Sequence, residues 1–69
     1  MYIVIELQTT KGETSSIVTT KPSKNEAMSA FHSIMAAAAI SNVEYHTAVV
    51  MDRKGQYIAK ECYEHISTK

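Results

Sequence analysis

The residue types that most often carry out chemistry in proteins are few in this chain of 69 residues. It contains three histidines and one cysteine: His32, His46, His65 and Cys62. If the segments around His46 and Cys62 pair as a hairpin, these two side chains lie opposite each other, with His65 on the other face. Structural zinc requires four ligands at recognisable spacing, and neither C-x-x-C nor H-x-x-x-H occurs. A Cys–His nucleophile would also need a cleft and a third, orienting group. We therefore expect no catalytic residue, no metal and no cofactor.

The best position for a phosphate-sized anion is the segment that leads into the expected helix. Lys21 and Lys24 flank Ser23, where backbone amides and the helix dipole favour negative charge. Arg53 could bind phosphate through two parallel hydrogen bonds, and Tyr57 could add an aromatic face. We therefore expect a ligand site made by Lys21, Lys24, Arg53 and Tyr57. The alternative is that capping side chains already occupy these amides and that the arginine belongs to a solvated turn.

One helix must position these groups, and the sequence predicts it over residues 23–41. Ser23 and Glu26 have the S-x-x-E spacing of a capping box, and Asn42 can adopt the left-handed conformation that ends a helix. At about 100° per residue, a narrow apolar stripe forms along one face. The stripe consists of Ala27, Phe31, Ile34 and Ala38.

The second half of this helix is apolar all round. Ala36, Ala39 and Ile40 lie on the face that is polar one turn earlier. A helix of this kind is usually covered on every side, and a chain this short has little material to cover it twice. We therefore expect a homo-oligomer in which a second copy covers these residues. The alternative is that alanine is simply a good helix former that tolerates water.

Four segments have the period-two alternation and β-branched content of strands. They are residues 2–9, 15–20, 43–51 and 56–65. Within the first, Ile3, Ile5 and Leu7 are expected to face the helix. The order predicts an α+β fold of the ββαββ type: a four-stranded, mainly antiparallel sheet with one covering helix.

The last two strands are expected to pair so that Asp52 lies opposite Gln56 across a turn that contains Gly55. In that register Tyr45 lies opposite Tyr63 and shares one sheet face with Tyr57. Both faces of this hairpin carry apolar groups, although a sheet covered by one helix needs only one such face. We therefore add Tyr45 and Tyr63 to the expected interface between subunits. A tyrosine-lined sheet could also stack an aromatic ring.

Length and composition exclude several classes of protein. The chain is expected to form a single domain over residues 1–69, because it is too short for two cores. Seven basic and seven acidic residues balance, so neither nucleic acid nor a membrane is an expected partner. One cysteine excludes an internal disulfide and fits a reducing cytosol. No segment resembles a signal peptide or a membrane span, so we expect a cytoplasmic protein.

Three stretches of the chain carry a resemblance. The opening MYIVIELQT, the helix ending AAAAIS and the hairpin VEYHTAVVM–GQYIAKECYEH are similar to small uncharacterised proteins of phages and prophages of Gram-positive gut bacteria. The similarity covers nearly the whole chain and includes no catalytic signature. It implies a phage accessory protein in the host cytoplasm, one that acts on host machinery or belongs to the virion.

Three classes of function follow from these features. The first is a non-enzymatic anti-defence protein that sequesters a nucleotide-type host signal between subunits. The second is a protein-interaction module, either an inhibitor of a host enzyme or a virion component. The third, an enzyme, has the least support because no catalytic constellation is present.

Overall fold

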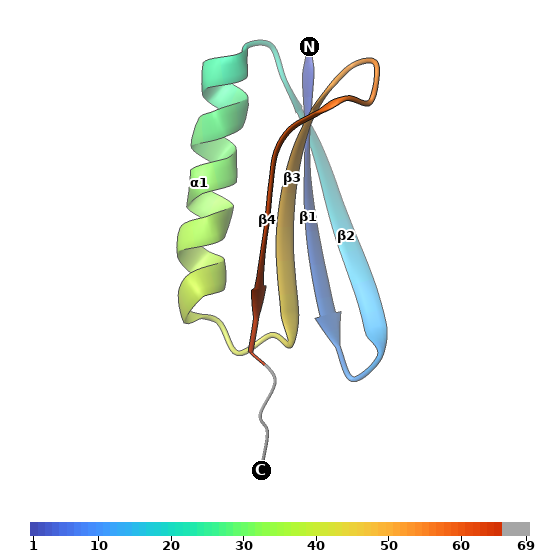
Figure 1. Ribbon diagram of the computed structural model, residues 1–69, viewed down its shortest axis with the longest axis vertical. Helices are drawn as coiled ribbons and strands as arrows, with labels where there is room; N and C mark the ends of the chain where they lie inside the picture. Colours follow the sequence, from blue (N-terminus) through green and yellow to red (C-terminus); the bar gives the residue numbers. More distant parts are fainter. Residues whose placement is uncertain (66–69) are drawn as a thin grey trace.

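The computed structural model describes residues 1–65 and contains five helices and strands in that range, which Figure 1 labels. They are β1 (Tyr2–Thr10), β2 (Glu13–Lys21), α1 (Lys24–Ile40), β3 (Tyr45–Asp52) and β4 (Tyr57–Glu64). The expected ββαββ order is confirmed, as is the α+β class with a four-stranded antiparallel sheet. Residues 66–69, which the sequence analysis placed in the same domain, lie outside the described range.

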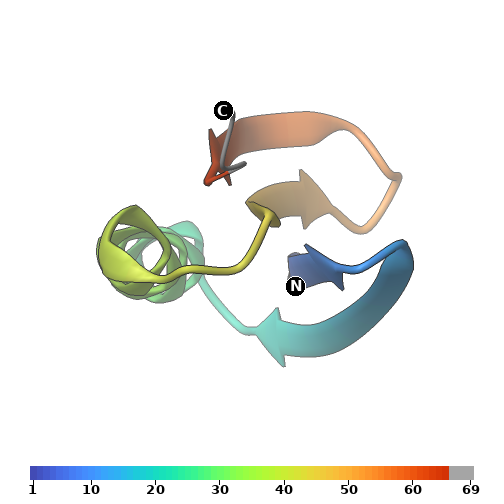
Figure 2. The same ribbon diagram turned by 90° about the horizontal axis from the view of Figure 1, so that it is seen from below.

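The strands lie in the order β2-β1-β3-β4, and every neighbouring pair is antiparallel. β2 and β3 therefore run in the same direction with β1 between them, and α1 makes the connection across one face of the sheet. Figure 2 shows α1 on one side of the strands; no other described element lies on the opposite side. Within residues 1–65 the sheet thus has a covered face and an open face, and no further strand pairs with either edge.

The face of β1 that lies against the helix is the opposite of the one that the sequence predicts. Val4 is buried with Val50 of β3 in the core beneath α1. Ile3, Ile5 and Leu7, which we expected to face the helix, alternate with Val4 and lie on the open face. The expectation was wrong because β1 has apolar residues on both faces. Alternation separates the two faces but does not decide which one a helix covers.

The open face is largely apolar where β1 and β3 cross it. The register places there Ile3, Ile5 and Leu7 of β1, Val18 of β2, and Val49 and Met51 of β3. Val49 is buried at 8% exposure and Val18 is 61% exposed, while the other four are half-buried, so this apolar group is only partly accessible.

The helix contributes three of the four residues of the predicted apolar stripe, with Met35 buried in place of Ile34. Its buried residues are Ala27, Phe31, Met35 and Ala38, and Ile34 packs partly buried at the edge. No helix among residues 1–65 is long and apolar enough to cross a membrane.

The β3–β4 hairpin begins in the expected register and then departs from it. The Asp52 amide donates to the Gln56 carbonyl at 3.0 Å, as the turn prediction requires. A bulge between Val50 and Met51 shifts the pairing by one residue, so that Tyr45 lies opposite Glu64. The expected pairing of Tyr45 with Tyr63 is therefore wrong, because the bulge sits in a stretch without glycine and leaves no clear signal in the sequence.

The start of α1 is capped as expected, whereas its end is not. Ser23 is the N-cap, and its hydroxyl accepts from the Glu26 amide at 3.2 Å. The Glu26 carboxylate accepts from the Ser23 hydroxyl at 3.3 Å, in place of the expected bond to the Ser23 amide. The C-cap is Ser41 in extended conformation, and the left-handed cap expected at Asn42 is absent. Ser41 replaces it by donating both its amide and its hydroxyl to the Ala38 carbonyl.

Removing the N-cap hydroxyl is expected to destabilise the domain measurably. Ser23→Ala leaves the Glu26 amide without its acceptor and should lower the free energy of unfolding by roughly 0.5–2 kcal/mol. Urea titration followed by circular dichroism measures the change. Ser29→Ala, an exposed serine inside the same helix, is the matched control and should not destabilise. Equal stability of the Ser23 variant and the unmodified chain would contradict this role.

Candidate functional site

The fold brings basic residues from separate segments to one end of the sheet. Tyr2 is the register partner of both Lys21 on β2 and Asp52 on β3, so Lys21 and the turn after Asp52 flank the start of β1. The helix starts at the same end (Figure 1). We call this region the basic end and define it by Lys21, Lys24, Arg53 and Lys54. It unites three of the four expected ligand residues, although the sequence separates them by up to thirty-two positions (21 to 53).

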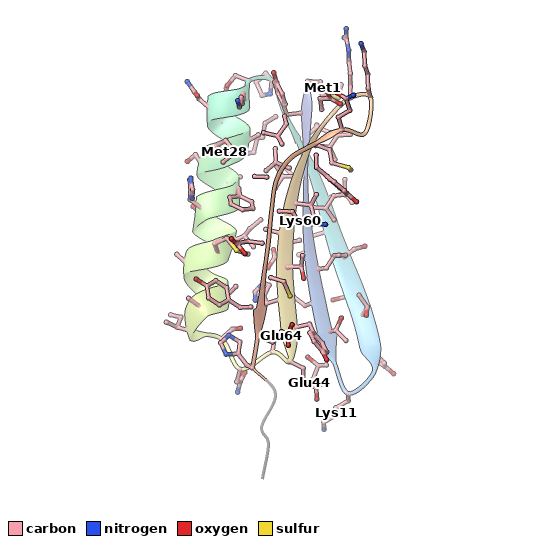
Figure 3. All side chains as sticks on the ribbon, in the orientation of Figure 1. Met1, Lys11, Met28, Glu44, Lys60 and Glu64 are labelled. Carbon is pink, nitrogen blue, oxygen red and sulfur yellow. The ribbon has the colours of Figure 1, made fainter. Side chains whose placement is uncertain are left out.

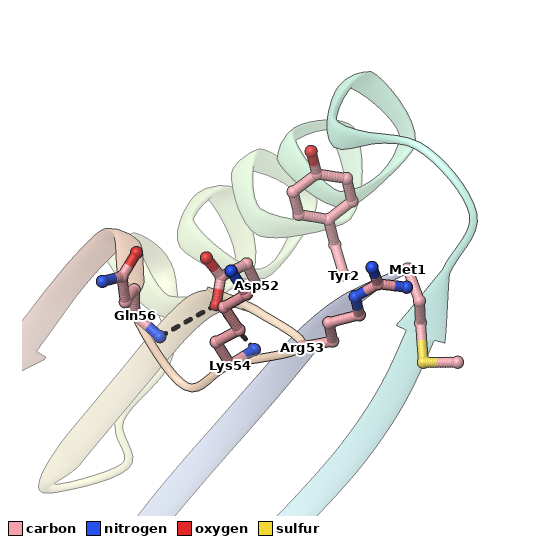
Figure 4. A pocket seen from close by; sticks show the side chains of 6 residues that line it. All are labelled: Met1, Tyr2, Asp52, Arg53, Lys54 and Gln56. Atoms are coloured by element: carbon pink, nitrogen blue, oxygen red, sulfur yellow. Dashed lines mark hydrogen bonds between the residues drawn. The ribbon is translucent and has the colours of Figure 1, made fainter.

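Two shallow clefts meet at the basic end. One, of about 370 Å³, is lined by Met1, Tyr2, Asp52, Arg53, Lys54 and Gln56. The other, of about 410 Å³, is lined by Met1, Thr20, Lys21 and Pro22. Figure 4 shows the guanidinium of Arg53 directed towards Met1, the residue that the two clefts share. A ligand that spans Met1 would therefore have Lys21 on one side and Arg53 on the other.

The Asp52 carboxylate at this end is already engaged. The Asp52 carboxylate accepts from the amides of Lys54 at 2.8 Å and Gln56 at 3.0 Å (Figure 4). These bonds close the turn, and Gly55 allows it by taking a φ of 85°. Because the turn holds Asp52 in place, Arg53 and Lys54 project from a fixed backbone.

Tyr57 and Lys24 fit the expected ligand site less well. Tyr57 is exposed, but the Lys60 ammonium lies over its ring at 4.8 Å from the centroid, so one ring face is already occupied. Lys24 is exposed in the first turn of α1, where Ser23 already occupies the Glu26 amide. Of the four expected ligand residues, Lys21 and Arg53 line the two clefts, whereas Lys24 and Tyr57 line neither.

The expected interface residues do not form one surface. Ala36, Ala39 and Ile40 are exposed on the outer side of α1, and Ile40 is 88% exposed. Tyr45 lies on the open face of the sheet, whereas Tyr63 lies on the helix side, opposite His46. A single partner could not cover both tyrosines through one flat contact.

A buried polar cluster that the sequence analysis missed lies towards the other end of the sheet. His46 is only 4% exposed, and its Nε2 lies 2.6 Å from the Glu6 carboxylate. Its Nδ1 lies 3.3 Å from the Ser41 hydroxyl at the end of α1. Glu6 and His46 are forty residues apart in the sequence, so no local pattern links them. The one available signal is that Glu6 shares a strand face with Val4, which places its side chain on the helix side.

Further bonds complete this cluster and set its electrostatics. Gln8 Nε2 donates to the Glu6 carboxylate at 2.9 Å, and His65 Nε2 donates to the Ala38 carbonyl at 2.7 Å. The hydrogen bond from His46, assisted by the one from Gln8, lowers the pKa of Glu6 below its ordinary value of 4.5, against the opposing effect of burial. No buried side-chain nitrogen or oxygen among the described residues lacks a partner.

The Ser41–His46–Glu6 arrangement contains the residue types of a catalytic triad, but its surroundings do not suit acyl transfer. An oxyanion requires converging N–H donors, and the end of a helix presents carbonyl oxygens instead. Ser41 already bonds one of these, on Ala38. The cluster therefore serves to anchor the helix end to the sheet.

The cysteine and histidine considered for metal binding are not neighbours. Cys62 lies opposite Thr47 on the open face, whereas His46 lies opposite Tyr63 on the helix side. Within residues 1–65 no group of three histidine, cysteine or acidic side chains could hold a metal ion.

Comparison with known proteins identifies no relative. No family model matches the chain, and neither does any curated protein or solved structure.

Proposed function

We propose that this protein is a small non-enzymatic binding protein that holds a phosphate-bearing nucleotide at its basic end. The observation that carries the proposal is the convergence of Lys21 and Arg53 on the two sides of Met1, where two clefts meet. Guanidinium and ammonium groups on a fixed backbone are suited to phosphate, and Tyr2 offers an aromatic ring in the same cleft.

The biological form of this proposal follows from the phage resemblance. A phage protein that binds a nucleotide signal and releases it unchanged would act in the host cytoplasm as an anti-defence sponge. Both clefts are shallow, and a monomer of this size can enclose little volume, so a second subunit would supply the missing wall.

Calorimetry against mono-, di- and cyclic nucleotides tests the proposal. We expect binding of at least one of them, weakened roughly tenfold or more when Lys21→Ala is combined with Arg53→Ala, because charge-assisted hydrogen bonds are lost. The matched control is Lys11→Asn with Lys60→Gln, which removes the same charge from two lysines that lie away from Met1 (Figure 3) and should bind normally.

Chromatography of the recovered ligand completes the experiment. An unchanged nucleotide supports a sequestering role, whereas a converted one would establish an enzyme. Absence of heat across the whole panel would refute nucleotide binding.

The open face of the sheet favours a second candidate function, a protein-interaction module. Ile3, Ile5 and Leu7 form a row along β1 that no described element covers. This reading predicts that nucleotides do not bind and that Ile5→Lys abolishes the biological effect while the fold, followed by circular dichroism, is retained.

A further inference from the structure

The two edges of the sheet differ in how they are protected. The edge strand β4 contains Lys60 and Glu61 in its middle and pairs through a bulge, features that hinder pairing with another strand. The edge strand β2 has neither. All of its residues except Lys21 are exposed, and residues 14–20 contain no charge, no proline and no bulge. A long, regular, uncharged edge of this kind is a template for a further strand.

The sequence of β2 is largely complementary to a second, antiparallel copy of itself. If two copies of β2 run antiparallel with Ile17 opposite Ile17, Glu13 of each copy lies opposite Lys21 of the other. Thr14 then faces Thr20, Ser15 faces Thr19, and Ser16 faces Val18. The opposite charges and the paired hydroxyl residues are cross-strand combinations that stabilise antiparallel sheets, and the two Ile17 side chains meet at the axis, whereas Ser16 with Val18 adds no favourable pair. From this complementarity we propose that the protein forms a dimer in which the β2 strands of two copies pair edge to edge about Ile17.

The backbone of β2 offers hydrogen bonds in the same register. The two-residue turn at Lys11 and Gly12, both with positive φ, makes Thr10 and Glu13 a hydrogen-bonded pair. Because such pairs alternate along the ladder, Ile17 also bonds inward to β1. The residues whose amides and carbonyls point outward are Thr14, Ser16, Val18 and Thr20. In the proposed register each of these lies opposite another of them, so all the outward groups find partners.

Side-chain burial is consistent with a partner at this edge. Ile17 is 57% exposed and Val18 is 61% exposed, and both are large apolar residues at the middle of the strand. The helix packs chiefly on β3 and β1 and least on β2. In this register, residues on the helix side of one copy lie opposite residues on the helix side of the other. The dimer therefore has one continuous eight-stranded sheet with both helices on the same side.

Substitution at the two-fold axis provides the first test. Sedimentation equilibrium should show a dimer for the unmodified chain. Ile17→Lys places two ammonium groups side by side and should raise the dimer dissociation constant about tenfold or more, whereas Ile17→Thr should have a smaller effect. Circular dichroism checks that each variant is folded. A monomeric unmodified chain, or an Ile17→Lys variant that dimerises normally, would overturn the proposal.

Charge exchange tests the register itself. Glu13→Lys alone, or Lys21→Glu alone, creates two like-charge pairs and should weaken the dimer. The two substitutions together restore opposite charges and should restore dimerisation. If the double variant is weaker than both single variants, Glu13 does not face Lys21.

Cross-linking tests the position of the axis. In a Cys62→Ser background, Ile17→Cys brings the two sulfur-bearing residues together in a non-hydrogen-bonded pair, with Cα atoms about 4.5 Å apart, within reach of a disulfide. Mild oxidation should therefore give a covalent dimer. Val18→Cys should cross-link poorly, because residue 18 of one copy lies opposite residue 16 of the other, two positions away from the second cysteine. Equal cross-linking of both variants would overturn the proposed axis.

Discussion

Replacing Phe31 with alanine is expected to leave the domain largely unfolded at room temperature. Phe31 is 7% exposed and lies in the middle of the buried stripe of α1, in the same core cluster as Val4 and Val50. Truncating a buried phenylalanine costs about 3–5 kcal/mol, through lost burial and the cavity left behind. A chain of this size usually has only about 3–5 kcal/mol of net stability from its core.

Circular dichroism during urea titration measures this effect. Phe31→Leu, which keeps most of the volume, should remain folded with a smaller loss of stability. Ser33→Ala, an exposed position two residues further along the helix, should change little. If the alanine variant unfolds at the same urea concentration as the unmodified chain, Phe31 does not lie in the core.

Breaking the Glu6–His46 pair is expected to have the second-largest effect. Glu6→Leu leaves the buried His46 Nε2 without its 2.6 Å partner, and an unsatisfied buried group costs roughly 1–3 kcal/mol, more if it is charged. Replacing both partners by apolar residues removes this penalty. We therefore expect Glu6→Leu with His46→Leu to be more stable than Glu6→Leu alone, a comparison that a double-mutant cycle makes quantitative. Strictly additive losses would show that the two side chains do not interact.

The same pair gives stability a pH dependence with a defined sign. Because the folded state lowers the pKa of Glu6, its carboxylate is more easily protonated in the unfolded chain. The contribution of Glu6 is therefore fully present above its ordinary pKa of 4.5 and is lost as the pH falls through the lower folded value. Urea titrations at successive pH values should show this decrease in the unmodified chain. Glu6→Gln should remove that part of the slope, and an unchanged slope would contradict the assignment.

The sequence alone was sufficient for the order of elements and for the helix. Ser23 and Glu26 identify its start because a capping hydroxyl acts within one turn. Ala27, Phe31 and Ala38 identify its buried side because helical periodicity is local. The hairpin turn at Gly55 follows from the same kind of short-range chemistry, since this glycine has a positive φ.

Only the tertiary structure decided which face of each strand the helix covers. Val4 and Ile5 are equally suited to a core, and the choice between them depends on how β1 packs between β2 and β3 under α1. The bulge next to Val50 likewise places Tyr63 on the helix side. The register of β4 beyond this bulge therefore depends on tertiary packing and not on the turn alone.

The candidate sites show the same division. Lys21 and Arg53 could be named from the sequence as candidates for binding phosphate, because their chemistry is intrinsic to the side chains. That they share one end of the sheet depends on β1 lying between β2 and β3. The Glu6–His46 contact joins residues forty positions apart, and no local pattern specifies such a pair. Contacts within a turn of helix or a hairpin are encoded by neighbouring residues, whereas contacts between distant segments exist only once the whole sheet has assembled on the helix.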